Sequence, residues 1–142
     1  MKVREIMSDA VVCIGPDEPV SAAARLLKRW NLGALPVCDP GGHLRGFVTD
    51  RDIVLRCIAT GDDPNRSTVR EIMSRAVSTV SADDGIDALT EKMGREQLRR
   101  LPVTEGGRVI GMVTLCDLAR RADCSMEAAA ALREISANIR KA

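Results

Sequence analysis

Short apolar segments alternate with polar turns along the first half of the chain, and their order predicts a small mixed unit. Residues 11–14 form a brief apolar run typical of a strand, and the apolar spacing over 20–27 is that of one helix face. Residues 35–38 and 44–48 read as two strands around a Pro-Gly-Gly turn, and 50–58 as a second helix. The pattern therefore predicts the order strand, helix, strand, strand, helix.

The same pattern occurs a second time. The six residues Val3–Ser8 recur letter for letter as Val69–Ser74, 66 positions later. Leu-Pro-Val and Gly-x-Val-Thr segments follow in both copies, the latter after a one-residue deletion that we assign to the tighter turn at 105–107. The matched segments are Leu35–Val37 with Leu101–Val103 and Gly46–Thr49 with Gly111–Thr114. This register indicates a duplicated unit.

The predicted fold class is α/β (α+β): two β-α-β-β-α repeats with pseudo-twofold symmetry, plus a C-terminal helix. We place the first repeat at 1–62, the second at 63–122 and a helical extension at 123–142. A repeat of about 60 residues buries only ~60% of its unfolded surface, so the two copies are expected to pack together. Grooves at their shared interface are then the natural ligand sites.

The extension has the apolar spacing of an amphipathic helix. Ser125 is a candidate N-cap, and the stripe consists of Ala128, Leu132, Ile135 and Ile139. One interpretation is a lid over exposed core, and the other is a contact between two copies of the chain.

Composition excludes several classes of protein. An apolar fraction of 45% is enough for an ordinary core, and a net charge of +1 provides no general field for nucleic acid or an anionic membrane. The longest apolar runs are far short of the ~20 residues needed to cross a bilayer. The first residues lack the apolar region of a signal peptide, so we expect a cytoplasmic protein. With Trp30 and Phe47 as its aromatic residues, the chain offers no stacking platform for single-stranded nucleic acid.

The five cysteines form no Cys-x-x-Cys pair, and their odd number fits a reducing compartment. They are Cys13, Cys38, Cys57, Cys116 and Cys124. Buried hydrophobic packing is the simplest interpretation. Cys13 and Cys38 fall in predicted strands that neighbouring pairing could bring together as a disulfide or metal site, and Cys116 could be a reactive thiol. The single histidine, His43, lies in a predicted turn with no triad or metal-ligand spacing around it.

Two segments that end in Gly-x-x-Thr-x-x-Asp carry a family resemblance. They are Gly46–Asp52 and Gly111–Asp117, each preceded by a Leu-Pro-Val strand. Over residues 1 to about 122 the chain resembles the tandem CBS-domain proteins, or Bateman modules, of the stand-alone bacterial type. The resemblance implies a module that usually dimerises and whose two clefts can bind AMP, ADP, ATP, S-adenosylmethionine or related molecules.

The resemblance also implies roles for the motif residues. The Asp, here Asp52 or Asp117, accepts hydrogen bonds from ribose hydroxyls, and the Thr, here Thr49 or Thr114, lies near the phosphates. A carboxylate suits a vicinal diol, and the N-H groups at a helix start suit phosphate. Thr-x-x-Asp before a helix is also close to a capping box, which duplication of the fold would preserve without any ligand.

Carried over position by position, each cleft draws on both repeats. The first comprises Val12, Cys13, Leu32, Gly33, Arg99, Arg100, Met112, Thr114 and Asp117. The second comprises Phe47, Thr49, Asp52, Ser78, Thr79 and Leu98, with Arg51 as a possible phosphate contact. Arg99 and Arg100 would face the phosphates of the first cleft, where the second has Gly33 and Ala34. The alternative for the two arginines is a solvated helix end, because Arg95 lies one turn earlier.

These observations predict a non-enzymatic sensor that needs no cofactor, binds an adenosine nucleotide as a regulatory ligand, forms a homodimer and signals to a regulated protein in trans. One alternative is a structural or protein-interaction module with vacant clefts. The other is a small thiol or metal enzyme that uses Cys13, Cys38 or Cys116, for which the sequence offers neither a ligand cluster nor a base.

Overall fold

The computed structural model describes residues 1–137, so the predicted stripe residue Ile139 lies outside it. The chain divides into two compact units, which we name by their motif threonines. The Thr49 unit contains residues 12–77 and 107–109. The Thr114 unit contains residues 1–11, 78–106 and the chain from 110 onwards.

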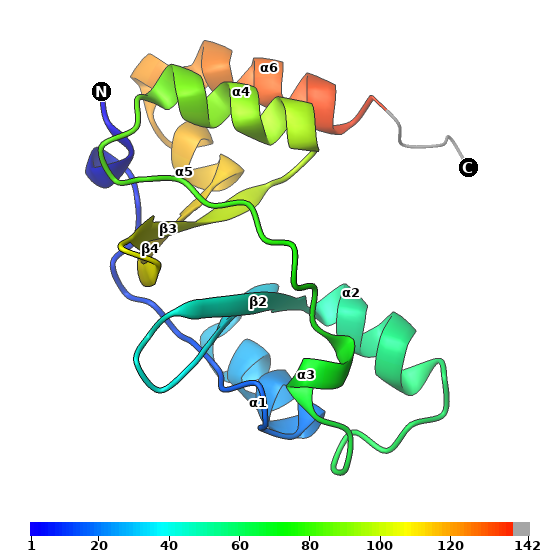
Figure 1. Ribbon diagram of the computed structural model, residues 1–142. Coiled ribbons are helices and arrows are strands. Elements are labelled where there is room, and N and C mark those ends of the chain that lie inside the picture. Colours follow the sequence, from blue (N-terminus) through cyan, green and yellow to red (C-terminus); the bar gives the residue numbers. More distant parts are fainter. Residues whose placement is uncertain (138–142) are drawn as a thin grey trace. The chain divides into compact units, whose positions relative to one another are not determined.

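Apart from the strand expected over 11–14, the Thr49 unit contains the predicted strands and helices of the first copy (Figure 1). Its elements are α1 (Val20–Trp30), β1 (Ala34–Cys38), β2 (Leu44–Thr49), α2 (Asp50–Ile53) and α3 (Val69–Ile72). The helix predicted over 50–58 is formed, but its second half, Val54–Ile58, winds as a π-helix. The strand predicted over 11–14 is reduced to a single parallel bridge between Ile14 and Val37.

The Thr114 unit repeats this arrangement. Its elements are the 3₁₀ turn Val3–Glu5, α4 (Ile86–Glu96), β3 (Arg100–Glu105), β4 (Arg108–Thr114, from Ile110 onwards), α5 (Leu115–Ala119), the 3₁₀ turn Ala122–Cys124 and α6 (Ser125–Ile135). Two glycines, Gly106 and Gly107, form the whole turn between β3 and β4. Their φ values of 58° and 79° lie in the left-handed region, which explains why this hairpin manages with a shorter turn than the first.

Each unit has a two-stranded antiparallel sheet with apolar side chains buried beneath its helices. β1 pairs with β2 so that Leu35 lies opposite Val48, and both are fully buried. In the Thr114 unit Leu101 and Val113 occupy the equivalent core, together with Leu89 of α4. Burial of each such side chain contributes about 1.5–3 kcal/mol of hydrophobic stabilisation.

Helix α6 packs against α4 and α5 in the Thr114 unit. Ala128, Ala131 and Ile135 are buried, whereas Leu132 of the predicted stripe is 48% exposed. Within the predicted stripe, Ala128 and Ile135 therefore cover core, as the lid interpretation expects, whereas Leu132 does not. The predicted cap is displaced by one residue, because Ser125 is the first helical residue and Cys124 occupies the N-cap position.

The duplicated segments Val3–Ser8 and Val69–Ser74 make equivalent contacts, each on the strands and helices of the other repeat. Ser8 exchanges backbone hydrogen bonds with Met112 of β4 at 2.8 and 2.9 Å. Ser74 does the same with Phe47 of β2, at 2.9 Å in both directions. Each segment thus adds a bridge beside the strand that leads into a Thr-x-x-Asp motif.

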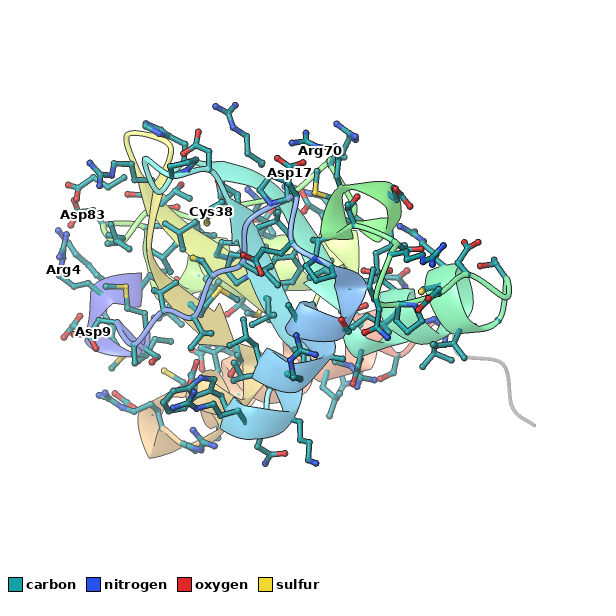
Figure 2. All side chains as sticks on the ribbon, turned by 90° about the horizontal axis from the view of Figure 1, so that it is seen from below. Arg4, Asp9, Asp17, Cys38, Arg70 and Asp83 are labelled. Carbon is teal, nitrogen blue, oxygen red and sulfur yellow. The ribbon has the colours of Figure 1, made fainter. Side chains whose placement is uncertain are left out.

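A buried valine and an ion pair also hold each of these two segments in place. Val3 and Val69 are fully buried. Arg4 pairs with Asp83 at 2.9 Å, and Arg70 pairs with Asp17 at 3.0 Å; Figure 2 labels both pairs. The hydrogen bond and charge of Arg4 hold the pKa of Asp83 below its usual range. The repetition of the segment therefore has a structural cause, since its valine, arginine and serine have the same kind of partner in both units.

The motif glycines are required by this close approach. A Cβ at Gly111 would lie 2.8 Å from the Ser8 carbonyl oxygen, and one at Gly46 would lie 2.7 Å from the Ser74 carbonyl oxygen. We expect Gly111→Ala and Gly46→Ala each to lower the free energy of unfolding by about 1–3 kcal/mol, the usual cost of overpacking. Urea denaturation measures this, with Gly15→Ala as control because its new Cβ would meet only Glu18 Cγ at 3.6 Å. Equal stability of all three variants would contradict the close-approach argument.

Candidate functional site

The motif threonine and aspartate form a complete capping box in both units. In the Thr49 unit the Thr49 N-H donates to Asp52 Oδ2 at 2.9 Å, and the Asp52 N-H donates to Thr49 Oγ1 at 3.0 Å. In the Thr114 unit the corresponding distances to Asp117 Oδ2 and from the Asp117 N-H are 2.7 and 3.1 Å. The interpretation of Thr-x-x-Asp as a capping box is therefore confirmed in both units.

Capping occupies only one oxygen of each carboxylate. Asp52 Oδ1 faces the Arg56 Nε at 3.8 Å, and Asp117 Oδ1 faces the Arg120 guanidinium at 3.6 Å. Within residues 1–137 neither Oδ1 accepts a hydrogen bond. The two side chains are partly exposed, at 14% and 18%. Each aspartate can thus cap its helix and still present an acceptor to a ligand, so the two interpretations do not exclude each other.

One residue from the start of the preceding strand is tied to each motif. The Leu115 N-H donates to the Arg99 carbonyl at 2.7 Å, and the Asp50 N-H donates to the Gly33 carbonyl at 3.0 Å. Arg99 therefore lies beside Thr114, and Gly33 beside Thr49, in equivalent places. The Thr114 unit carries a cation at a position where the Thr49 unit carries none.

Arg99 and Arg100 differ from the arginine that precedes them. Arg95 lies on α4 and pairs with Glu91 at 3.8 Å and Glu96 at 3.9 Å. Arg99 and Arg100 follow the helix, which ends at Glu96, and Arg100 begins β3. Among the described residues neither of these two guanidiniums has an ion pair or hydrogen bond, and the same is true of Arg51. Arg95 is therefore neutralised on α4, whereas Arg99 and Arg100 lie beyond the helix end without such a partner, an arrangement that fits both a solvated helix end and a phosphate contact.

The remaining predicted site residues are distributed over both units. Met112 forms a β-bridge with Ser8, and Phe47 forms one with Ser74. Leu32 is 39% exposed. The Ser78 hydroxyl donates to Glu96, and the Thr79 carbonyl accepts from Lys92 Nζ at 2.6 Å. Val12 and Leu98 pack at the margins of their units' cores. Because each predicted cleft combines residues of the Thr49 and Thr114 units, its assembly remains a prediction.

The other chemical candidates of the sequence can be placed as well. His43 is exposed in the first hairpin turn, with Nδ1 3.4 Å from Asp39 Oδ1, as predicted for a surface residue. Cys116 is exposed at the start of α5. Over residues 1–137 no three or more His, Cys, Asp or Glu side chains are grouped so that they could hold a metal ion. In the same range, no helix has the length and apolar character needed to cross a membrane.

Comparison with known proteins identifies the class. The CBS domain matches residues 3–58 and again residues 69–123, which is most of the chain. The chain therefore belongs to the CBS-domain family and contains two copies of the domain, so the predicted fold class and the resemblance are confirmed.

Individual relatives extend this result. Hypoxic response protein 1 of Mycobacterium tuberculosis is 39% identical over 117 residues, which is 82% of each chain. A crystal structure of Hypoxic Response Protein I with two coordinated zinc ions has a TM-score of 0.78 at 38% identity, covering 85% of this chain and 98% of the other. The CBS domain pair of protein MJ0100, in complex with 5-methylthioadenosine and S-adenosyl-L-methionine, has a TM-score of 0.75 at 31% identity, covering 84% and 98%.

Proposed function

We propose that this chain is a non-enzymatic regulatory module that binds an adenosine-containing nucleotide, such as AMP, ADP, ATP or S-adenosylmethionine, in clefts between its two repeats. The observation that carries the proposal is the set of uncommitted groups around Thr114. Within residues 1–137 the guanidiniums of Arg99 and Arg100 have no partner, and the Arg99 carbonyl accepts a hydrogen bond from the Leu115 N-H at the start of α5. Asp117 Oδ1, which Arg120 faces at 3.6 Å, accepts no hydrogen bond in the same range. Cations that no acidic side chain neutralises are available to a phosphate.

The motif carboxylates support a contact with the ribose. Asp117 Oδ1 is an acceptor of the kind that a vicinal diol requires, and Asp52 Oδ1 supplies the same group in the other unit. A CBS pair with 31% identity is known in complex with two adenosine-containing ligands. We assign the stronger phosphate site to the half-site of Thr114, because its counterpart has Gly33 and Ala34 in place of the two arginines.

Signalling requires that the nucleotide bind one arrangement of the module better than another. In this proposal a regulated protein in trans reads that change, and the module acts as a homodimer. Exposed apolar side chains on the helix that follows Thr49 offer a surface for self-association: Val54, Leu55 and Ile58 are 55%, 47% and 54% exposed. Sedimentation velocity at micromolar concentration tests the dimer, and a monomer under these conditions would refute it.

A second candidate is a structural or interaction module whose clefts stay vacant. The complete capping boxes favour it, because they give Thr49, Asp52, Thr114 and Asp117 a stabilising role that needs no ligand. Both candidates predict the same fold and differ in ligand binding.

Two measurements separate these candidates. Protein purified without added nucleotide is denatured, and the released small molecules are identified by mass spectrometry. Calorimetric titration with AMP, ATP, S-adenosylmethionine and adenosine then gives affinities. Saturable binding of at least one ligand at micromolar to millimolar concentration supports the sensor. No released nucleotide and no heat of binding for all four would establish the vacant module.

A further inference from the structure

A pair of cysteines in the Thr49 unit is held together by backbone hydrogen bonds. The Ile14 N-H donates to the Pro36 carbonyl at 3.1 Å, and the Cys38 N-H donates to the Ile14 carbonyl at 2.9 Å. These two bonds bring the segment before α1 alongside β1. The Cys38 thiol then donates a hydrogen bond to Cys13 Sγ at a sulfur–sulfur distance of 3.2 Å.

The fold itself does not require cysteine at these positions. In the Thr114 unit the Val80 N-H donates to the Pro102 carbonyl at 3.1 Å, and the Thr104 N-H donates to the Val80 carbonyl at 2.9 Å. The positions equivalent to Cys13 and Cys38 are therefore Thr79 and Thr104. The same backbone arrangement is built with two threonines in one unit and with two thiols in the other, so the thiols call for a chemical explanation.

The two sulfurs are unequal. Cys13 is exposed and Cys38 is only 6% exposed. The hydrogen bond from Cys38 lowers the pKa of Cys13, against a smaller opposing effect of burial. The same contact, together with burial and the negative charge of Asp39, raises the pKa of Cys38. The accessible sulfur is thus the one that ionises first, and the thiolate is the nucleophilic form of cysteine.

A hollow of about 740 Å³ opens beside the pair, and both cysteines line it. Arg45 and Arg70 also line it, but Arg45 is paired with Asp39 at 2.7 Å and Arg70 with Asp17 at 3.0 Å. Figure 2 shows Asp17 and Arg70 side by side, with Cys38 also labelled in that view. Because its cations are neutralised by neighbouring carboxylates, the hollow favours a small uncharged reactant over an anion.

We propose that Cys13 and Cys38 form a peroxide-reactive dithiol site, in which Cys13 is the attacking sulfur and Cys38 the resolving sulfur. The Cys13 thiolate attacks one oxygen of hydrogen peroxide, so that an S–O bond forms, the O–O bond breaks and hydroxide leaves as water after protonation. Cys38 then attacks the Cys13 sulfur, an S–S bond forms, and the S–O bond breaks with release of water that takes up the Cys38 proton. Two thiols and one peroxide give one disulfide and two waters.

The second step needs only a short movement. The sulfurs must approach from 3.2 Å to the disulfide length of about 2.05 Å, which side-chain rotation on two bridged segments can supply. A dithiol reductant reverses the reaction by thiol–disulfide exchange. The site lies within the Thr49 unit, so the inference does not depend on nucleotide binding.

The equivalent threonines supply matched variants. Reduced wild type, Cys13→Thr, Cys38→Thr and the double variant are each treated with one equivalent of hydrogen peroxide at neutral pH, and products are read by intact mass and peptide mapping. Cys116→Thr is the control, because Cys116 is exposed on α5 and makes no sulfur–sulfur hydrogen bond among the described residues.

We expect wild type and Cys116→Thr to lose two hydrogen atoms, with the crosslink mapped to Cys13 and Cys38. Cys38→Thr should stop at a sulfenic acid on Cys13 that a carbon nucleophile such as dimedone traps. Cys13→Thr and the double variant should show no such rapid product. The proposal is overturned if the double variant reacts as fast as wild type, or if mapping places the first oxidation on Cys116. Nucleotide binding is measured in Cys38→Thr, because Cys38 belongs to neither predicted cleft. Intact binding in this variant separates the failure of one proposal from that of the other.

Discussion

Asp117→Ala is expected to lower both the affinity for AMP and the stability of the Thr114 unit, because its two carboxylate oxygens have different tasks. Loss of Oδ2 removes the capping bonds to the Thr114 N-H and hydroxyl, which costs about 1 kcal/mol of unfolding free energy. Loss of Oδ1 removes the proposed ribose acceptor. Hydrogen bonds to a charged group contribute roughly 1.5–3 kcal/mol, so the dissociation constant should rise at least about tenfold.

Asp52→Ala is the matched control, since Asp52 makes the equivalent capping bonds in the Thr49 unit. It should lower the melting temperature by a similar amount and leave the tighter AMP site almost unchanged. Calorimetry gives the affinities and differential scanning fluorimetry the melting temperatures. If both variants have lower melting temperatures and bind AMP with wild-type affinity, the motif serves only to cap its helix. That result would support the module with vacant clefts.

Much of the fold could be predicted from the sequence because duplication doubles every signal. The hairpin turns, the Leu-Pro-Val strands and the helix starts are marked by Gly, Pro and Asp at two places in register, and the structure contains each of them. The strand predicted over 11–14 shrinks to one bridge, since an apolar run fixes burial but not the number of residues that find a pairing partner.

The contacts of Val3–Ser8 and Val69–Ser74 could not be predicted in the same way. Identical segments have identical local preferences, so the sequence cannot tell which repeat each one contacts. The clue lay in the glycines of the two motifs: Gly46 and Gly111 leave room for the Ser74 and Ser8 carbonyls. Reading those glycines as sites of close backbone approach would have indicated a neighbouring segment but not its identity.

For the candidate site, the sequence spacing predicted the motif residues but not which nearby arginines are paired with carboxylates. Whether an arginine is free depends on the carboxylates around it in space. Arg95 and Arg99 are four residues apart, yet the first is committed to Glu91 and Glu96 and the second is not. The same holds for Cys13, whose hydrogen bond from Cys38 spans 25 residues of sequence. Such distinctions come from tertiary contacts and need coordinates.

The two free arginines lead to a test that separates phosphate recognition from shape. Arg99→Ala and Arg100→Ala are each expected to weaken AMP binding by about fivefold to a hundredfold. This loss corresponds to one charge-assisted hydrogen bond of roughly 1–3 kcal/mol. The effect should be smaller at the exposed Arg99, where solvent screens the charge. Adenosine has no phosphate and should bind with nearly unchanged affinity. Calorimetric titration of both ligands measures the difference directly.

Arg95→Ala is the control for this test, because it removes a nearby cation that α4 already neutralises. It should change neither affinity. Raising the salt concentration should weaken AMP binding to wild type more than to the Arg99→Ala and Arg100→Ala variants, since screening acts on the charge that the variants lack. Equal losses for AMP and adenosine would mean that the arginines shape the cleft. A loss in Arg95→Ala as large as in the other two would mean that general positive charge, and not two placed guanidiniums, attracts the nucleotide.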